Sequence, residues 1–84
     1  MVIYNFQQEA PKVEQALRRA FPTNSIIEVE EGYQGRVRAK VISSRLNGMR
    51  EQEKQNYLWD ILQVELGAEA ESIAFVLAYG TDEL

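Results

Sequence analysis

Two stretches in the middle of the chain, residues 25–31 and 36–43, alternate apolar and polar residues, which is typical of half-buried β-strands. If Tyr33-Gln34-Gly35 forms the turn between them, with Gly35 in the positive φ of a three-residue hairpin loop, the strands pair antiparallel. This register pairs apolar with apolar residues on the buried side and acids with bases on the open side: Ile27 with Val41, Val29 with Ala39, Glu28 with Lys40 and Glu30 with Arg38. A register shifted by one residue would bury the charges.

A helix is predicted ahead of this hairpin, over residues 10–22, because apolar residues recur there at helical spacing. Pro11 suits its first position and Pro22 ends it. The inward stripe consists of Val13, Ala16, Leu17, Ala20 and Phe21. Residues 1–9 are more apolar than a mobile tail should be, with alternation at Val2, Tyr4 and Phe6. They fit either an edge strand or an irregular segment packed on the core.

A second helix is predicted after the hairpin, starting with the polar run at residues 50–56 and ending at a C-cap on Gly67. Its inward stripe consists of Tyr57, Leu58, Ile61 and Leu62. Trp59 lies off that stripe, so we expect it to be partly exposed. Gly48 is expected to take a bend before the helix that a larger residue would resist.

The last strand is predicted within "SIAFVLAYGT", residues 72–81. Alternation places Ile73, Phe75, Leu77 and Tyr79 on one face, and Ala74, Val76 and Ala78 on the other. Both faces are apolar, so the strand is either covered on both sides or leaves one face available to a partner. Together these elements predict one domain, residues 1–84, with a small two-layer α/β (α+β) architecture.

The composition narrows the chemistry. The 84 residues include no cysteine and no histidine, which removes disulfides, Cys/His zinc sites, thiolate catalysis and the side chain that usually titrates near neutral pH. We therefore expect no enzyme activity and no cofactor. No apolar run approaches the roughly 18 residues that span a bilayer, and no charged leader precedes an apolar segment, so we expect a cytoplasmic protein without membrane contact.

The net charge of −4 is unevenly distributed. All nine basic residues lie between Lys12 and Lys54, whereas the chain from Gln55 onward carries six acids and no base. The acidic total argues against a general nucleic-acid binder, although one part of the surface could still be basic. The Gly-x-x-Gly at residues 32–35 lies between two strands, where it forms a turn rather than the inter-helix clamp of KH domains.

The order of elements and several residues resemble the BolA family from about Val13 to Thr81. The strongest part is "VISSRLNGMREQEKQNYLWDIL", residues 41–62. Ser44, Leu46 and Gly48 stand where BolA proteins have a strand-ending serine followed by an aromatic-x-glycine, with leucine replacing the aromatic residue. Lys54-Gln55-Asn56 stands at the Arg-His-Arg triplet of the long helix. In the last strand Ala74 and Thr81 match, and Ile73 replaces the family's histidine.

The resemblance implies a class II KH-like sandwich of order αββ(α)αβ. Its three-stranded sheet would be mixed, with the first two strands antiparallel, the last strand parallel to a neighbour and the helices on one face. BolA proteins partner monothiol glutaredoxins, and several share an iron–sulfur cluster with them through histidine or cysteine ligands. This chain has neither residue type, and "GYQG" is shorter than the family's ligand loop. A cluster-binding role is therefore not expected.

Two functions remain open. The first is a non-enzymatic BolA-like adaptor or regulator, a monomer or weak homodimer, that docks a protein partner such as a monothiol glutaredoxin without ligating a cluster. Its candidate surface consists of Lys54, Gln55, Asn56, Trp59 and Ile73. The alternative is a KH-type nucleic-acid-binding module with a basic surface made of Arg36, Arg38, Lys40, Arg45, Arg50 and Lys54. Cross-strand ion pairs also explain part of that basic set without any ligand.

Overall fold

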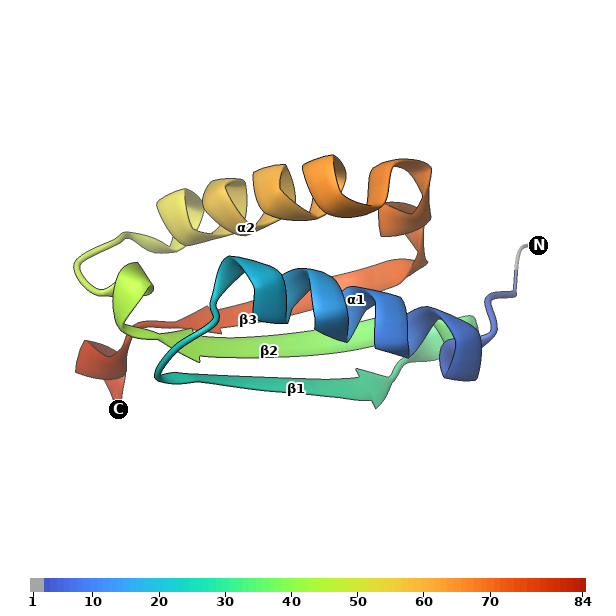
Figure 1. Cartoon of the computed structure of the whole chain (residues 1–84), viewed down its shortest axis with the longest axis horizontal. Helices are drawn as coiled ribbons and strands as arrows, with labels where there is room; N and C mark the ends of the chain where they lie inside the picture. The colour runs from blue at the N-terminus through green and yellow to red at the C-terminus, as the bar shows by residue number, and fades with distance from the viewer. Residues whose placement is uncertain (1–2) are drawn as a thin grey trace.

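A computed structural model describes residues 3–84 and contains two helices over a three-stranded sheet (Figure 1). The elements follow in the order α1 (Phe6–Ala20), β1 (Ser25–Glu31), β2 (Val37–Ser43), α2 (Glu51–Leu66) and β3 (Ile73–Tyr79). The strand order is β1-β2-β3, with β1 antiparallel to β2 and β3 parallel to β2. Both helices lie on the same side of the sheet, so the expected two-layer α/β fold with a mixed sheet is confirmed.

The hairpin register is confirmed at every predicted pair: Ile27 with Val41, Glu28 with Lys40, Val29 with Ala39 and Glu30 with Arg38. Gly35 takes a φ of +76° in the turn, as predicted, and Gln34 beside it also lies in the left-handed region. The turn is held from outside, because the Tyr4 backbone N–H donates to the Gln34 carbonyl at 2.9 Å.

Helix α1 begins earlier than predicted, which corrects the expectations for residues 3–9 and for Pro11. Asn5 caps the helix, its side-chain oxygen accepting a hydrogen bond from the Gln7 N–H at 3.1 Å. Pro11 therefore lies inside the helix and not at its first position. The edge strand is wrong over residues 3–9, where Phe6 and Ala10 extend the inward stripe by one turn; Val2 lies outside the described residues.

Helix α2 buries Leu58 and Leu62 completely, as predicted, while Tyr57 and Ile61 are only partly buried. The remaining inward position is taken by a charged residue, Lys54. The helix ends at Gly67 with a φ of +58°, which confirms the predicted C-cap. No helix within residues 3–84 combines the length and the apolar character needed to cross a membrane.

Strand β3 departs from simple alternation at its start. Val37 of β2 pairs with Ile73, and the next residue of β2 pairs with Phe75, so Ala74 is an extra residue in the ladder. The irregularity turns Ile73 to the helix side with Val76 and Ala78, which corrects its predicted place beside Phe75. Phe75 and Leu77 remain on the open face, 42% and 40% exposed, so this face is uncovered in the chain.

Candidate functional site

Gln55 and Trp59, two of the predicted partner-binding residues, join α2 to β3. The Gln55 side-chain N–H donates to the Val76 carbonyl at 2.8 Å, and the Trp59 indole N–H donates to the Gln55 side-chain oxygen at 3.2 Å. Both residues are partly buried, so Trp59 is partly exposed as expected. The two bonds orient an aromatic side chain and an amide beside the last strand.

These residues belong to a set of neighbouring side chains that carry no charge themselves, which we call the uncharged flank. It consists of β3 and of a stripe on α2 made of Gln52, Gln55, Asn56, Trp59 and Gln63. The stripe repeats every three or four residues, which puts its members on one side of the helix. Trp59, Gln63 and Ile73 line one shared hollow, which shows that the stripe and the start of β3 adjoin; the charged residues Arg36 and Glu71 line the same hollow and border the flank there.

The two edges of the sheet differ in their protection against pairing. β1 forms one edge and carries three exposed acids, Glu28, Glu30 and Glu31. β3 forms the other edge and contains no charged residue, proline or glycine. Charges and prolines are the usual means of keeping an edge strand from pairing with another chain. On β3 the Gln55 hydrogen bond to Val76 occupies one backbone carbonyl in their place.

Lys54 and Ile73, also predicted to contact a partner, are buried at 2% and 4% exposure. Ile73 is buried because of the ladder irregularity described above. The Lys54 ammonium lies 2.7 Å from one Glu83 carboxylate oxygen and 3.2 Å from Glu51. The hydrogen bond with Glu83 is the main cause that raises the pKa of Lys54 and lowers the pKa of Glu83. Neither Lys54 nor Ile73 offers a surface in this conformation.

Glu83 belongs to a short C-terminal segment, Thr81–Glu83, that folds back on the loop before α2. The Asn47 side chain bonds the Thr81 hydroxyl at 2.9 Å and accepts from the Asp82 N–H at 3.2 Å. The Gly48 N–H donates to the Asp82 carboxylate at 3.0 Å, and Gly48 has a φ of +77°, so the predicted bend is confirmed. These contacts span 34 or more positions, so no local pattern around Asn47 predicts them.

The six predicted nucleic-acid-binding residues do not form one surface. Arg38 and Lys40 lie on β2 and Arg36 directly precedes it; the charged groups of Arg36, Arg38 and Lys40 stack over Tyr4, Phe75 and Tyr79 at 5.1, 5.4 and 5.9 Å. The other three are dispersed: Arg45 is on the helix side, Arg50 is exposed at the start of α2 beside Glu53, and Lys54 is buried. Lys40 also lies 3.8 Å from Glu28, an ion pair that the cross-strand prediction anticipated.

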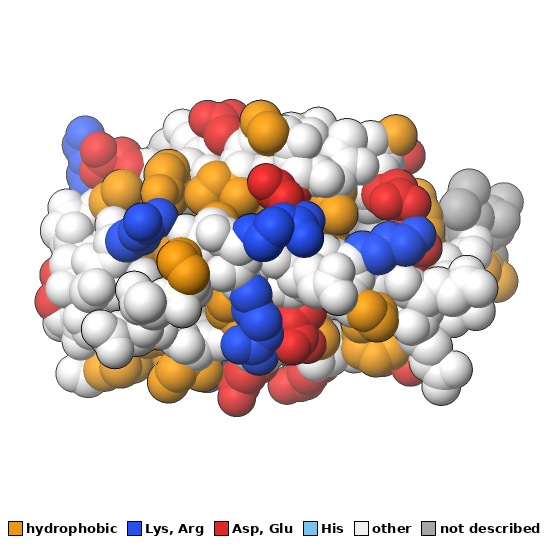
Figure 2. Space-filling view, in the orientation of Figure 1, with side chains coloured by type: hydrophobic (Ala, Val, Ile, Leu, Met, Phe, Trp, Pro, Cys, Tyr) orange, Lys and Arg blue, Asp and Glu red, His pale blue; other side chains and the backbone are white. Residues whose placement is uncertain are grey.

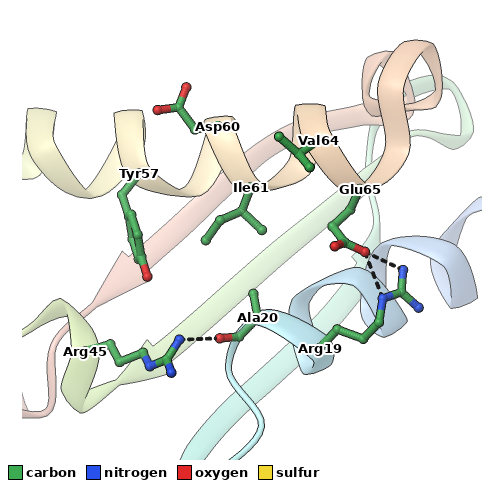
Figure 3. A pocket seen from close by; sticks show the side chains of 8 residues that line it. All are labelled: Arg19, Ala20, Arg45, Tyr57, Asp60, Ile61, Val64 and Glu65. Carbon is green, nitrogen blue, oxygen red and sulfur yellow. Dashed lines mark hydrogen bonds and ion pairs between the residues drawn. The ribbon is translucent and has the colours of Figure 1, made fainter.

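On the helix side, α1 and α2 border an open groove of about 550 Å³ (Figure 3). Its lining combines apolar and charged side chains: Arg19, Ala20, Arg45, Tyr57, Asp60, Ile61, Val64 and Glu65. Arg19 pairs with Glu65 at 2.7 Å, and Arg45 donates to the Ala20 carbonyl at 2.7 Å. On this side of the molecule Lys and Arg side chains alternate with hydrophobic ones along the seam between the helices (Figure 2).

No set of three or more His, Cys, Asp or Glu side chains within residues 3–84 is arranged to hold a metal ion. Comparison with known proteins yields no matching family model, no matching curated protein and no matching solved structure.

Proposed function

We propose that this chain is a non-enzymatic BolA-like adaptor that docks a protein partner on its uncharged flank and does not ligate an iron–sulfur cluster. The observation that carries the proposal is the absence of charge along β3 and the α2 stripe beside it, in a chain with 26% charged residues. The cores of protein interfaces are depleted in charged residues and enriched in aromatic ones.

Trp59 supplies the aromatic anchor that such a surface needs. Tryptophan is over-represented among the few residues that dominate binding energy, and here its indole is oriented by the bond to Gln55. The exposed amides of Gln52 and Asn56 bond each other at 3.1 Å, so this end of the flank is polar without being charged, whereas Arg36 and Glu71 border the flank at the start of β3. A partner that covers the stripe and leaves Arg36 and Glu71 at the rim removes little charge from water.

The partner class comes from the resemblance to BolA proteins. The antiparallel pair β1–β2 and the parallel pair β2–β3 agree with the sheet that the resemblance implies. This agreement makes monothiol glutaredoxin the first partner to test. The cluster is left out of the proposal because the chain has no histidine or cysteine, and Ile73, at the family's ligand position, is a buried aliphatic side chain.

The test is a titration of isotope-labelled protein with apo monothiol glutaredoxin, followed by nuclear magnetic resonance. We expect shifts at Gln52, Asn56, Trp59 and β3, and at least about tenfold weaker binding for Trp59→Ala. Tyr33→Ala is the matched control, because Tyr33 is an exposed aromatic residue on the hairpin turn. Absence of binding at about 1 mM, the weak limit of specific association, would exclude monothiol glutaredoxin as the partner. Shifts confined to the open face of the sheet would exclude the uncharged flank as the docking surface.

A second candidate is weak binding of single-stranded nucleic acid on the open face of the sheet. It is favoured by two cations stacked on aromatic rings of β3, Arg38 on Phe75 and Lys40 on Tyr79. Basic and aromatic side chains on a sheet are a common platform for unpaired bases. Glu28 and Glu30 on the adjacent strand oppose it by repelling phosphates.

Binding on the open face should be mostly electrostatic and should fade between about 50 mM and about 150 mM salt. Fluorescence anisotropy with labelled single-stranded and duplex oligonucleotides measures this, with Arg38→Gln as the variant and Arg18→Gln, on α1, as the control. A tight complex that survives physiological salt and depends on Arg38 would make nucleic-acid binding the primary function.

A further inference from the structure

The groove between α1 and α2 exposes an apolar stripe that the chain covers only in part. Tyr57, Ile61 and Val64 follow one another on α2 at intervals of four and three residues, which is the spacing of a helix-packing surface. Val64 is 84% exposed. Figure 3 shows Tyr57 and Ile61 pointing from α2 toward the space beside α1. A stripe of this kind fits the apolar face of another helix.

Arg45, at one end of the groove, is exceptional among the nine basic residues. Within residues 3–84, six of the nine have a carboxylate within 4.0 Å: Lys12, Arg18, Arg19, Lys40, Arg50 and Lys54. Arg36 and Arg38 stack over aromatic rings. Arg45 has neither kind of partner in the described chain and bonds only the Ala20 carbonyl. The groove therefore contains one cation whose charge is not matched.

Asp60 is the matching unpaired anion on the same groove. It makes no ion pair or side-chain hydrogen bond with any of residues 3–84, although it lines the groove with Arg45. In Figure 3 the Asp60 carboxylate points away from Arg45, with the α2 ribbon above the groove and Arg45 below it. The two charges are thus presented on one surface without meeting each other.

We propose that α2 of a second copy of this chain occupies the groove in a twofold-symmetric dimer. The occupant must be a helix with an apolar stripe and a carboxylate next to it, and α2 carries both in Tyr57, Ile61, Val64 and Asp60. In a twofold interface each contact occurs twice with the roles exchanged. Asp60 of each copy then neutralises Arg45 of the other, while the two apolar stripes cover each other.

The contact area of this dimer is smaller than that of a typical stable complex. A helix of 16 residues is about 24 Å long, and two helices side by side are about 20 Å wide, giving a footprint of about 480 Å² per copy. Stable complexes bury about 800 Å² per partner, so we expect a weak dimer that dissociates reversibly on dilution. Trp59 lies on the other side of α2, so dimerisation leaves the uncharged flank free and does not depend on the proposed adaptor function.

Sedimentation velocity of the full chain from about 10 μM to about 1 mM, a range that spans weak association, tests the dimer. We expect a reversible shift toward twice the chain mass, abolished by Val64→Glu, whose exposed site leaves the fold intact. Arg45→Glu and Asp60→Arg should each weaken association at least about tenfold, and the double variant should restore it. Glu30→Arg, on the open sheet face, is the control and should leave association unchanged.

Three outcomes would overturn the proposal. The first is a monomer at every concentration. The second is a dimer that persists in Val64→Glu, since this would place the contact elsewhere, for instance on the edge of β3. The third is a double charge variant that associates no better than Asp60→Arg alone, because Asp60 and Arg45 would then not meet across the interface.

Discussion

Lys54 shows how one residue can be charged and still occupy an inward helix position. Its stem lies beside Leu58 on the buried face of α2, and its ammonium meets Glu83 and Glu51 at the edge of the core. A buried ammonium is tolerated only when it is paired and hydrogen-bonded. The C-terminal segment therefore completes the core by supplying the Glu83 carboxylate, and the two residues must be considered as a unit.

The Lys54–Glu83 pair makes stability depend on pH in a defined way. The pKa of Glu83 lies below its ordinary 4.5 in the folded protein, so its contribution is present above pH 4.5 and is lost as pH falls through the folded pKa. The pKa of Lys54 lies above its ordinary 10.5, so its contribution is complete below pH 10.5 and is lost at higher pH. The pair stabilises the fold between these limits.

We therefore expect Glu83→Gln to lower the midpoint of urea denaturation at about pH 7 and to have a smaller effect at about pH 3, because pH 3 lies below the ordinary pKa of 4.5 and part of the contribution of the carboxylate charge is already lost there. Glu31→Gln is the control, because Glu31 is exposed and has no ion-pair partner within residues 3–84. An equal loss of stability at both pH values would show that the carboxylate charge is not what stabilises Lys54.

Two glycines with nearly the same φ allow the cost of backbone strain to be separated from the cost of steric crowding. Gly35 and Gly48 have φ values of +76° and +77°. A Cβ at Gly48 would meet no atom within 4 Å, whereas one at Gly35 would overlap the Tyr4 carbonyl oxygen. Gly48→Ala should cost about 1–2 kcal/mol of the free energy of unfolding, from the left-handed conformation alone.

Gly35→Ala should exceed the cost of Gly48→Ala by at least about 1 kcal/mol, because Tyr4 must move and its bond to Gln34 is lost. Chemical denaturation of both variants gives the difference directly. Equal costs would mean that the segment before α1 yields freely and contributes little to the turn.

At the scale of elements, the β1–β2 hairpin places apolar side chains on the buried face of the sheet and charged side chains on its open face. Val37 is fully buried, while its neighbour Arg38 is exposed opposite Glu30. Val37→Asp should therefore cost at least about 3 kcal/mol in the free energy of unfolding by burying an unpaired charge. Arg38→Gln should cost less than about 1 kcal/mol. Similar, small losses for both variants in a denaturant titration would contradict the burial of this strand.

Each of the two errors in the predicted elements has a physical cause, local for α1 and dependent on the partner strand for β3. Helix α1 starts at Phe6 because Asn5 caps it and Phe6 and Ala10 continue the apolar stripe; proline at position 11 concealed this by resembling a helix start. Strict alternation along β3 predicts Ile73 on the same face as Phe75, but an extra residue at Ala74 turns Ile73 inward. A ladder irregularity depends on the partner strand, so the residues of β3 alone could not reveal it.

At the scale of the whole molecule, three different surfaces remain available: the uncharged flank, the groove between the helices and the open face of the sheet. α2 separates the first two, with Trp59 toward the flank and Ile61 toward the groove. A dimer through the groove would thus present two flanks to partners. This arrangement would allow two weak contacts to act together on one bivalent partner.

The chain has no cysteine or histidine side chain to ligate iron, and this predicts how it behaves toward a cluster-loaded monothiol glutaredoxin. Carboxylate, amide, hydroxyl, thioether and amine groups are poor replacements for thiolate or imidazole at a sulfur-rich iron centre. We expect visible circular dichroism of the cluster to stay unchanged on addition of this protein, even if the apo proteins associate. A new spectrum together with a one-to-one complex would contradict this.

Ile73→His should not create a ligand for the cluster. Ile73 is 4% exposed on the helix side of β3, so an imidazole there would be buried away from a partner, and the short turn at residues 33–35 still lacks a second donor. The same circular dichroism titration tests this variant, after far-ultraviolet spectra show that it folds. A cluster spectrum altered by Ile73→His alone would show that β3 can present this side chain outward.

The hairpin register, the helix-over-sheet layering and the special glycines could be predicted from the chain's local patterns. Alternation and helical spacing record which side of each element is buried, and a register shifted by one residue would bury Glu28, Glu30, Arg38 and Lys40, whereas a shift by two would not; the turn at Gly35 then selects the observed register. Positive φ at Gly35 and Gly48 is likewise a local property, since glycine adopts it without steric cost.

Which residues meet at each site depends on contacts between segments that are far apart in the sequence. Lys54 meets Glu83, Gln55 meets Val76 and Arg45 meets Ala20 across 21 to 29 positions of sequence. No local sequence pattern encodes contacts over such separations, because they depend on how each helix docks on the sheet and where along the sheet the helix lies. The docking of α2 buries Lys54 with Glu83, places Trp59 beside an uncharged strand, and leaves Arg45 and Asp60 on one groove without partners.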